Sequence, residues 1–490
     1  MSKFLDLESG MTAAAAMYIG GKWRNDASRV RLDVLNPANE QVIATIPDGT
    51  AEDAVAALEA ARRAQPQWAA LPAPQRGRMV ARLADAVVRD KERLARVVTA
   101  EQGKPISQAR GEIDAVEAFL RYAAENARRI EGDIVASDNP NEEIQIRQHP
   151  HGVVVGLTAW NYPAALAARK LGPALVAGNT FVLLAHEITP LSGLELARLA
   201  EEVGIPHGVF NVVTGRGAVV GQALVESPLC DLVTMTGSTR AGKQIYATGA
   251  ATLKVLRLEL GGKAPFIVMD DADVDAAVKA AVIGRYTNCG QICTCNERMY
   301  LHRGIADQFM EKFVAASSAL TIGDPLTDPD IGPKVSGVEV EKIDEIVARG
   351  EAAGARVLLR GGALREGAYQ KGYWYAPTVM EVDANSSPLI QEEVFGPVVP
   401  MMRVDDFDEA AALANDTDYG LSAYVFTRDM KTLLRTPSAL KFGEIYFNRP
   451  NGEAIQGFHT GWKQSGLGGE DGKYGFDGYL RKQTLYVNWD

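Results

Sequence analysis

The residues best suited to covalent chemistry are three cysteines crowded into one short stretch, Cys289, Cys293 and Cys295. The stretch lies between an apolar run typical of a helix and a run typical of a strand, where a cysteine can face a cleft. Its thiolate is a strong nucleophile if the thiol pKa is lowered. Free cysteines are more often buried as small hydrophobic residues, which is the interpretation favoured for Cys289, Cys295 and the distant Cys230. The spacing does not suit zinc and only His302 is near, so no metal site is expected.

Three further segments contain residues that would complete a site around Cys293. Glu259 lies in the run Leu-Glu-Leu-Gly-Gly-Lys, 34 positions before Cys293 (293 − 259). Asn161 lies in Thr-Ala-Trp-Asn-Tyr-Pro, and Gln-Glu-Glu-Val-Phe-Gly-Pro follows at 391–397. Taken singly, an asparagine before Tyr-Pro is usually a turn residue and a glutamate in a strand is usually solvated. Together and in this order, the segments resemble the aldehyde dehydrogenase superfamily, from about Met17 to the C-terminus.

The resemblance implies that an aldehyde is oxidised through a covalent intermediate on Cys293. The thiolate would attack the aldehyde carbon, and the Asn161 side-chain amide and the Cys293 backbone N–H would hold the oxyanion. After a hydride passes to a nicotinamide, a thioester remains, and Glu259 would act as general base for the water that hydrolyses it. Apolar neighbours can raise the pKa of Glu259 toward neutrality. The resemblance also implies that Lys170 supports Asn161.

Two other classes of function compete with this interpretation. A CoA-acylating dehydrogenase would not need Glu259, so the presence of this residue disfavours that reaction. A non-catalytic structural protein on the same fold is disfavoured by the joint presence of Cys293, Asn161 and Glu259.

A glycine-rich turn at 235–242 is the candidate cofactor site. Glycines let the backbone approach a pyrophosphate and a helix N-terminus favours negative charge, although tight turns need glycine anyway. The usual Gly-x-Gly-x-x-Gly signature does not follow the first strand of the sheet. The turn is similar to the variant cofactor turn of aldehyde dehydrogenases, and the resemblance implies these cofactor-binding residues: Trp160, Glu187, Gly217, Gly221, Thr236, Gly237, Ser238, Glu393 and Phe395.

The choice of cofactor depends on the residues after the second strand of the sheet. The family usually has a lysine and a serine at the positions of Leu184 and His186. Glu187 is retained, and a carboxylate there should hydrogen-bond a ribose 2′-hydroxyl and repel a 2′-phosphate, which favours NAD. His186 could instead meet a phosphate, so NADP stays possible.

Within the family, the closest pattern belongs to dehydrogenases of lactaldehyde and glycolaldehyde. The shared segments are 168–170, 453–459 and 467–473, whereas Thr294 stands where that branch has asparagine. A guanidinium at Arg169 can bind a hydroxyl, a carboxylate or a sulfonate, although Arg169 also suits a helix surface. Succinate semialdehyde dehydrogenases have arginine there too, so a semialdehyde or a sulfonated aldehyde is the alternative to a small polar aldehyde. The residues implied to face the substrate are Arg169, Thr294, Glu453 and His459.

Short apolar strands alternate with helices from 151 to about 260, which predicts a parallel sheet with helices on both faces. A second α/β unit begins near Phe266. The expected fold is α/β and aldehyde dehydrogenase-like, with a Rossmann-type cofactor domain, a second α/β catalytic domain and a small β element for oligomerisation. The expected boundaries are 17–128 with 149–261 for the cofactor domain, 262–465 for the catalytic domain, 129–148 with 480–490 for the oligomerisation strands, and 1–16 for a disordered leader.

The predicted β element indicates an oligomer. The segment 131–150 is polar and resembles a protruding hairpin, and the segment 483–488 alternates like a strand. We expect the terminal strand to pair with the hairpin of another subunit, and therefore a homotetramer or a homodimer.

Composition limits the partners and the compartment. The chain has 490 residues, a net charge of −11 and a pI near 5.3, which disfavours nucleic acid and anionic membranes as partners. No apolar run approaches the roughly 18 residues of a membrane span. The N-terminus is a poor signal peptide, and four cysteines in so long a chain are not a typical disulfide framework. A cytoplasmic enzyme whose partner is a small aldehyde is therefore expected.

Overall fold

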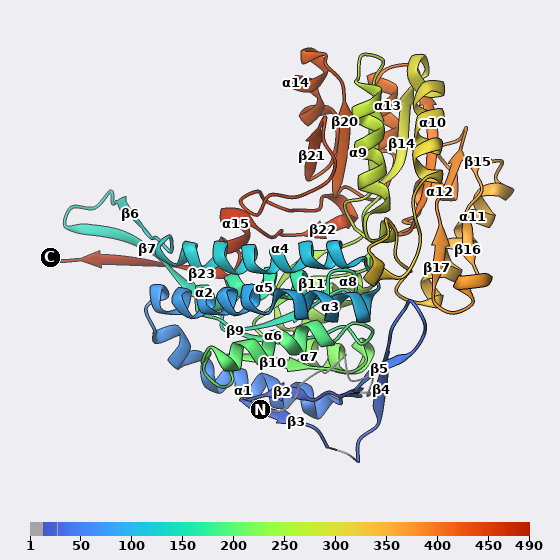
Figure 1. Ribbon diagram of the computed structural model, residues 1–490. Coiled ribbons are helices and arrows are strands. Elements are labelled where there is room, and N and C mark those ends of the chain that lie inside the picture. Colours follow the sequence, from blue (N-terminus) through green and yellow to red (C-terminus); the bar gives the residue numbers. More distant parts are fainter. Residues whose placement is uncertain (1–12, 27) are drawn as a thin grey trace.

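The computed structural model describes residues 13–26 and 28–490, which form two large sheets and a projecting arm (Figure 1). The first sheet contains β2 (Met17–Ile19), β3 (Lys22–Arg24), β8 (Val153–Leu157), β9 (Thr180–Leu184), β10 (Phe210–Val213), β11 (Leu232–Thr236), β12 (Val255–Glu259) and β22 (Gly466–Leu467). The strand order is β22-β12-β11-β8-β9-β10-β2-β3. The strands from β12 to β10 are parallel, while β2 and β22 run antiparallel to their neighbours.

Helices cover this sheet because its central strands are largely apolar and are buried on both faces; every residue of β9 is buried. The helices are α1 (Ala51–Ala70), α2 (Ala73–Arg89), α3 (Lys91–Gln102), α4 (Ile106–Glu125), α5 (Pro163–Ala177), α6 (Leu191–Glu202), α7 (Gln222–Glu226) and α8 (Thr239–Gly249). Nearly all of α5 is buried, and the indole N–H of Trp68 in α1 donates to the carbonyl of Leu175 in α5 at 2.9 Å. The helix α5, which follows Asn161, is therefore buried against α1.

The second sheet contains β13 (Ala264–Val268), β14 (Asn296–His302), β15 (Arg356–Leu359), β18 (Thr378–Glu381), β19 (Val398–Val404), β20 (Ser422–Phe426) and β21 (Glu444–Phe447). Their order is β15-β18-β19-β14-β13-β20-β21, and only β15 is antiparallel to its neighbour. The helices of this part are α9 (Val274–Tyr286), α10 (Arg303–Ser318), α11 (Gly337–Ala352), α12 (Pro388–Gln391), α13 (Phe407–Asn415) and α14 (Met430–Ala439). With two such sheets, the predicted α/β fold with two α/β units is confirmed.

The remaining elements are small. They are β1 (Ala13–Ala14), β4 (Arg31–Leu35), β5 (Val42–Pro47), β16 (Gly362–Leu364), β17 (Trp374–Ala376) and α15 (Gly472–Asp477). A disordered leader was expected over 1–16, and its residues 1–12 lie outside the described residues. For 13–16 the expectation is wrong, because β1 pairs in parallel with β5 and Ala15 and Ala16 are buried.

The arm is a three-stranded sheet of β6 (Asp133–Ala136), β7 (Glu142–Pro150) and β23 (Leu480–Asn488), which extends away from the rest of the molecule (Figure 1). The expected pairing of β23 with another subunit's hairpin is wrong. β23 pairs antiparallel with β7 of its own chain, from Leu480 opposite Pro150 to Asn488 opposite Glu142. The cause is local: the Asn179 side chain donates to the Tyr479 carbonyl at 3.0 Å, which places the start of β23 beside the end of β7.

Across 13–26 and 28–490, no helix combines the length and apolar character needed to cross a membrane.

Candidate active site

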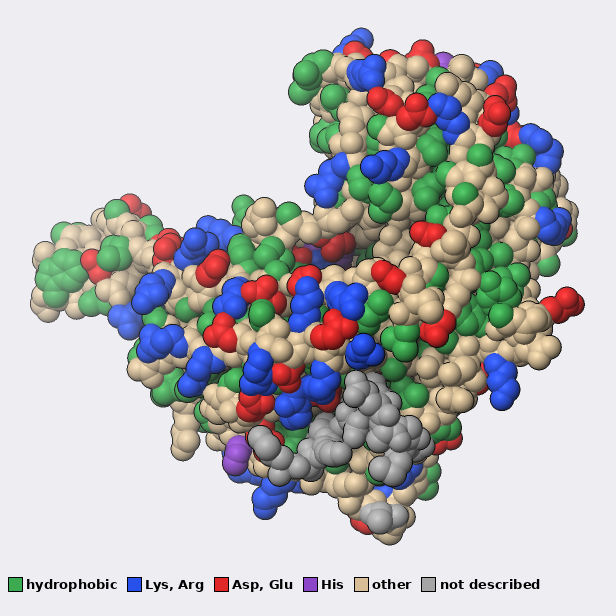
Figure 2. Space-filling view, in the orientation of Figure 1, with side chains coloured by type: hydrophobic (Ala, Val, Ile, Leu, Met, Phe, Trp, Pro, Cys, Tyr) green, Lys and Arg blue, Asp and Glu red, His purple; other side chains and the backbone are tan. Residues whose placement is uncertain are grey.

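The predicted catalytic residues come from both sheets and meet where the sheets adjoin. Asn161 precedes α5, Glu259 ends β12, and Cys293 lies shortly before β14. A Cβ at Gly262 would lie 2.4 Å from the carbonyl oxygen of Cys293, so the backbones approach as closely as only glycine allows. Figure 2 shows a hollow between α4 and the lobe built on the second sheet, with acidic side chains at its floor, where Figure 1 places β22 and α15.

The loop that carries the candidate nucleophile Cys293 joins α9 to β14, and its backbone is strained. Asn288, Cys289 and Gly290 all adopt left-handed conformations, with φ of 52°, 55° and 72°. A Cβ at Gly290 would lie 2.6 Å from the backbone of Gly396. The turn leaves Cys293 half-buried, whereas the other three cysteines are buried, which confirms their interpretation as core residues.

Asn161, the candidate oxyanion donor, is bound directly to this loop. Its Nδ2 donates to the carbonyl oxygen of Gln291 at 2.9 Å. An amide nitrogen carries two hydrogens, so one is left for an oxyanion. The Oδ1 atom is buried and has no hydrogen-bond partner among the described residues. The single bond to Gln291 therefore sets the orientation of the amide relative to Cys293.

A buried ion pair that sequence reasoning missed fixes the backbone of Asn161. The Lys104 ammonium donates to Glu112 at 2.5 Å and to the Asn161 carbonyl at 2.8 Å, and it lies 3.4 Å from the centre of the Tyr162 ring. The other Glu112 oxygen accepts from the backbone N–H of Ala164 at 2.9 Å, in the first turn of α5. Lys104 and Glu112 thus hold both the residue and the helix that follows it. The sequence signal was a lysine between glycine and proline, which resembles an ordinary loop.

The implied contact between Lys170 and Asn161 does not form among the described residues. Lys170 is fully buried and is paired with Glu470, which also accepts from the hydroxyl of Thr234 at 2.9 Å. The lysine that contacts Asn161 is Lys104. Lys104 lies before α4 and Lys170 lies within α5, and no local pattern in the sequence shows which of the two contacts Asn161.

Lys104→Met is expected to lower the free energy of unfolding by about 3–5 kcal/mol, because it leaves the Glu112 carboxylate buried without its counter-ion. The double variant Lys104→Met/Glu112→Gln should recover part of this loss, since the amide keeps an acceptor and carries no charge. The urea midpoint at constant slope measures both changes. The matched control is Lys91→Met, which breaks the exposed pair with Asp114 and should cost at most about 1 kcal/mol; equal losses for Lys104 and Lys91 would contradict the prediction.

Glu259 has the properties of a general base. Burial raises its pKa to about 7, with His459 opposing and Glu470 adding to the shift. Neither carboxylate oxygen has a hydrogen-bond partner among the described residues, and the nearest charged atom is His459 Nε2 at 3.5 Å. A carboxylate with unused acceptors and a pKa near neutrality can take a proton from water at physiological pH.

The residues expected to face the substrate form one cluster with the nucleophile. Burial raises the pKa of the Cys293 thiol and His459 opposes that rise. Burial also raises the pKa of the Glu453 carboxyl, but His459, Arg169 and Thr294 all lower it and the net shift is downward. Arg169 lies 3.7 Å from Glu453, but its main partner is Asp471. Sequence reasoning missed three acidic members of this cluster, which are Glu444, Glu470 and Asp471.

The glycine-rich turn after β11 fits a dinucleotide. The Ser238 side chain caps α8 by accepting from the backbone N–H of Ala241 at 3.3 Å. The Gly237 N–H donates to the Glu259 carbonyl at 3.0 Å, so the turn lies against the base. The Thr236 hydroxyl oxygen is buried with no hydrogen-bond partner in the described part of the chain. An unmatched hydroxyl beside a helix N-terminus suits phosphate oxygens.

The second glycine turn lies beside the position implied for the adenosine ribose. The Gly217 N–H donates to Glu187 at 3.1 Å, and a Cβ at Gly217 would meet open space. Gly221 packs against Leu184, where a Cβ would lie 3.3 Å from the side chain. Burial lowers the pKa of His186 to about 4, so this imidazole is neutral at physiological pH and offers no charge to a 2′-phosphate.

The loop at 391–397 brings the residues implied for the nicotinamide end to the same place. Glu393 accepts from the Gly262 N–H at 2.7 Å, and burial raises its pKa to about 8. The rings of Trp160 and Phe395 meet edge to face at 5.4 Å. Phe395 has a φ of 53°, a strained angle held because its N–H donates to Glu297 at 2.8 Å. These residues fit a dinucleotide, whose nicotinamide would supply the hydride acceptor.

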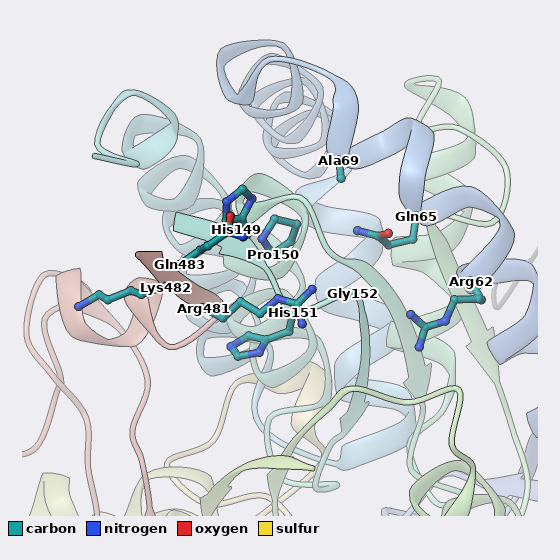
Figure 3. Close-up of a pocket in the computed structure, with 10 residues that line it drawn as sticks. All are labelled: Arg62, Gln65, Ala69, His149, Pro150, His151, Gly152, Arg481, Lys482 and Gln483. Atoms are coloured by element: carbon teal, nitrogen blue, oxygen red, sulfur yellow. The ribbon is translucent and has the colours of Figure 1, made fainter. Parts of the chain in front are cut away.

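A cavity of about 450 Å³ lies away from these residues, at the base of the arm (Figure 3). Its lining includes the basic side chains of Arg62, His149, His151, Arg481 and Lys482. None of the catalytic or substrate residues above lines it, so it is not the site of the chemistry.

Comparison with known proteins agrees with this geometry. A sequence profile described as "Aldehyde dehydrogenase family" matches residues 23–485. The 3,6-anhydro-alpha-L-galactose dehydrogenase of Vibrio sp. (strain EJY3) is 48% identical over 477 residues, covering 97% of this chain and 99% of that protein. Lactaldehyde dehydrogenase of Escherichia coli (strain K12) is 44% identical over 476 residues, covering 96% and 98%.

The solved structures give the same result. A structure of 3,6-anhydro-L-galactose dehydrogenase in complex with NAP superposes with a TM-score of 0.95 at 47% identity, covering 97% of this chain and all of that one (100%). A sequence match over nearly the whole length, on a site with this arrangement, leaves one assignment: the chain belongs to the aldehyde dehydrogenase family and is an NAD(P)-dependent oxidoreductase.

Proposed function

We propose that the protein oxidises a small, neutral, hydroxylated aldehyde of the lactaldehyde or glycolaldehyde type to its carboxylic acid, with NAD as the preferred cofactor. Cys293 attacks the aldehyde carbon, Asn161 and the Cys293 N–H hold the oxyanion, and Glu259 activates the water that hydrolyses the thioester. Glu187 beside a neutral His186 supports NAD over NADP, because a 2′-phosphate would face a carboxylate and no cation.

The observation that carries the substrate class is the engagement of Arg169. Its guanidinium donates to Asp471 through two nitrogens, one at 2.9 Å, and it lies 3.4 Å from Glu470 and 3.7 Å from Glu453. Because the guanidinium is already paired with these carboxylates, it is not free to bind a substrate anion. Glu453 is partly exposed and accepts hydrogen bonds, which suits a substrate hydroxyl and disfavours a substrate carboxylate.

Asp471→Asn is expected to raise the ratio of kcat/KM for succinate semialdehyde to kcat/KM for glycolaldehyde by about tenfold or more, which corresponds to about 1.4 kcal/mol. The change removes the negative charge of the carboxylate that pairs with Arg169 and keeps the shape of the side chain. The measurement is an aldehyde panel of glycolaldehyde, lactaldehyde and succinate semialdehyde, run with NAD and with NADP, for wild type and variant.

The control is Asp477→Asn, at the end of α15, which should leave the ratio unchanged. A wild-type enzyme that prefers succinate semialdehyde would overturn the proposed substrate class. A preference for NADP would overturn the proposed cofactor choice and leave the substrate class standing.

A further inference from the structure

Lys334 is a fully buried lysine that lies three residues before α11. Its backbone N–H donates to the Tyr373 carbonyl at 2.7 Å. The N–H of the next residue, Val335, donates to the side-chain oxygen of Gln291 at 3.0 Å. Gln291 belongs to the loop that carries Cys293. The segment around Lys334 is therefore bonded both to the second sheet's surroundings and to that loop.

The Lys334 ammonium lies beside the residues implied for the nicotinamide end of the cofactor. It donates to the carbonyl oxygen of Phe395, and its nitrogen lies 5.8 Å from the centre of the Phe395 ring and 5.8 Å from the centre of the Trp160 ring. A Cβ at Gly396 would lie 3.8 Å from the same nitrogen. An ammonium at such a distance is attracted by the electron-rich faces of aromatic rings. These contacts hold the positive charge at the two rings.

The charge of Lys334 has no direct counter-ion. In the described part of the chain its ammonium forms no ion pair, and the bond to Phe395 uses one of its three hydrogens. The buried carboxylate of Glu297 is engaged elsewhere, since it accepts from Lys263 at 2.9 Å and lies 3.5 Å from Arg285. A cation without an adjacent carboxylate acts strongly on any other charge brought into the same buried space.

The ammonium form of Lys334 predominates at neutral pH. Burial lowers its pKa to about 8, and Arg285 adds to the fall. Cys289, Glu339 and Glu297 oppose it. Because the resulting pKa is still above 7, most molecules carry the positive charge at pH 7.

We propose that Lys334 sets the balance between the two redox forms of the cofactor, by disfavouring the cationic nicotinamide of NAD⁺ relative to the neutral ring of NADH. The inference rests on the proposed function, with the nicotinamide beside Trp160 and Phe395. In the reaction a C–H bond of the thiohemiacetal alkoxide breaks, the hydride carries its electron pair to the ring, the substrate carbon is oxidised to a thioester, and the ring loses its positive charge. Lys334 keeps its proton throughout. Its repulsion acts on the ring only before the transfer, which favours oxidation of the aldehyde.

The test is the ratio of the dissociation constants of NAD⁺ and NADH, measured by calorimetry at pH 7 without aldehyde. The adenosine, the phosphates and both riboses are common to the two forms, so their contacts cancel and the ratio reports the charge of the ring. Lys334→Gln removes the charge and keeps a donor for the Phe395 carbonyl. It should lower the ratio Kd(NAD⁺)/Kd(NADH) by about tenfold, because NAD⁺ is freed from a repulsion that NADH does not experience.

Lys334→Met separates the charge from the hydrogen bond, because it removes both. If the charge matters, the ratio falls by a similar factor in Lys334→Met and Lys334→Gln, and cofactor binding itself shows that each variant is folded. If Lys334→Gln does not fold, Lys334→Met decides the question. The matched control is Lys371→Gln, an exposed lysine whose replacement changes the net charge equally and should leave the ratio unchanged.

Three results would overturn the proposal. The first is an unchanged ratio in a folded Lys334→Gln variant. The second is a fall in the ratio in Lys334→Met alone, which would mean that the lysine acts by holding the Phe395 carbonyl. The third is an equal fall in Lys371→Gln, which would mean that net charge alone is responsible.

Failure of the nicotinamide placement gives a different result. Trp160→Leu should weaken the binding of NAD⁺ and NADH and leave unchanged the binding of ADP-ribose, which lacks the nicotinamide. Equal weakening of ADP-ribose would refute the placement, and the inference would be refuted with it. The expected result for Trp160→Leu, together with an unchanged ratio in the Lys334 variants, would overturn the role of Lys334 alone. Because no aldehyde is present, the outcome does not depend on the proposed substrate class.

Discussion

Glu259→Gln is expected to release one rapid burst of NADH and then to turn over about 10²–10⁴ times more slowly than wild type. The variant keeps Cys293 and Asn161, so the thioester forms, but the amide cannot accept a proton from the hydrolytic water. Because burial raises the pKa of Glu259 to about 7, the steady rate of the wild type should rise as the pH increases through about 7, where the carboxylate form accumulates. Stopped-flow absorbance separates the burst from the steady phase.

Two controls make this result specific to the base. Cys293→Ala should give neither a burst nor steady turnover, since no thioester can form. The rise in steady rate near pH 7 should be missing from Glu259→Gln. Steady turnover at the wild-type rate in Glu259→Gln would refute the assignment of the base, and so would a variant that loses the burst.

The second large effect is expected for Asn161→Ala, with a loss of about 10²–10³ in kcat, or about 2.7–4 kcal/mol of barrier. The variant removes a donor already fixed by its bond to Gln291, 2.9 Å away. Since the oxyanion forms before the thioester, the burst should become slow as well. That slow burst distinguishes the oxyanion donor from the base in the same stopped-flow experiment.

The comparison for Asn161→Ala is Asn288→Gly. Asn288 donates to the backbone carbonyl of Asn161 at 3.0 Å, and glycine readily adopts its φ of 52°. This change loosens the contact between the two segments and leaves the Asn161 amide in place, so its loss of activity should be much smaller. If both variants lose activity equally, the role of Asn161 is to hold the loop.

Sequence patterns predicted the repeating elements well, because these follow from local periodicity, whereas the site segments were identified by their resemblance to the aldehyde dehydrogenase superfamily. The strand β9, for example, lies within the region from 151 to about 260 in which short apolar strands were predicted. Cys293 stood out because it lies in a cluster of three cysteines, whereas Glu259 was assigned through the resemblance. Asn161 was identifiable only in their company.

The residues that sequence reasoning missed are charged groups buried by distant partners. Lys104 contacts Asn161 57 positions later, and Glu112 contacts Ala164 52 positions later. In a sequence such residues are indistinguishable from solvated charges, since no local period marks a buried ion pair. Arg169 was noticed, but its engagement with Asp471 depends on a residue 302 positions away. Tertiary packing likewise decides which lysine contacts Asn161 and which strand pairs with β23.

The acidic side chains near Cys293 come from one segment of the chain. This segment runs from β21, at the edge of the second sheet, to α15, just after β22. The segment carries Glu444, Glu453, His459, Glu470 and Asp471. The candidate catalytic residues Cys293, Asn161 and Glu259 lie outside it. Its strands β21 and β22 are edge strands of the two sheets, so replacing the segment need not disturb the hydrogen bonds between the central strands. The accepted aldehyde can therefore change through replacement of this one contiguous segment, while Cys293, Asn161 and Glu259 stay unchanged.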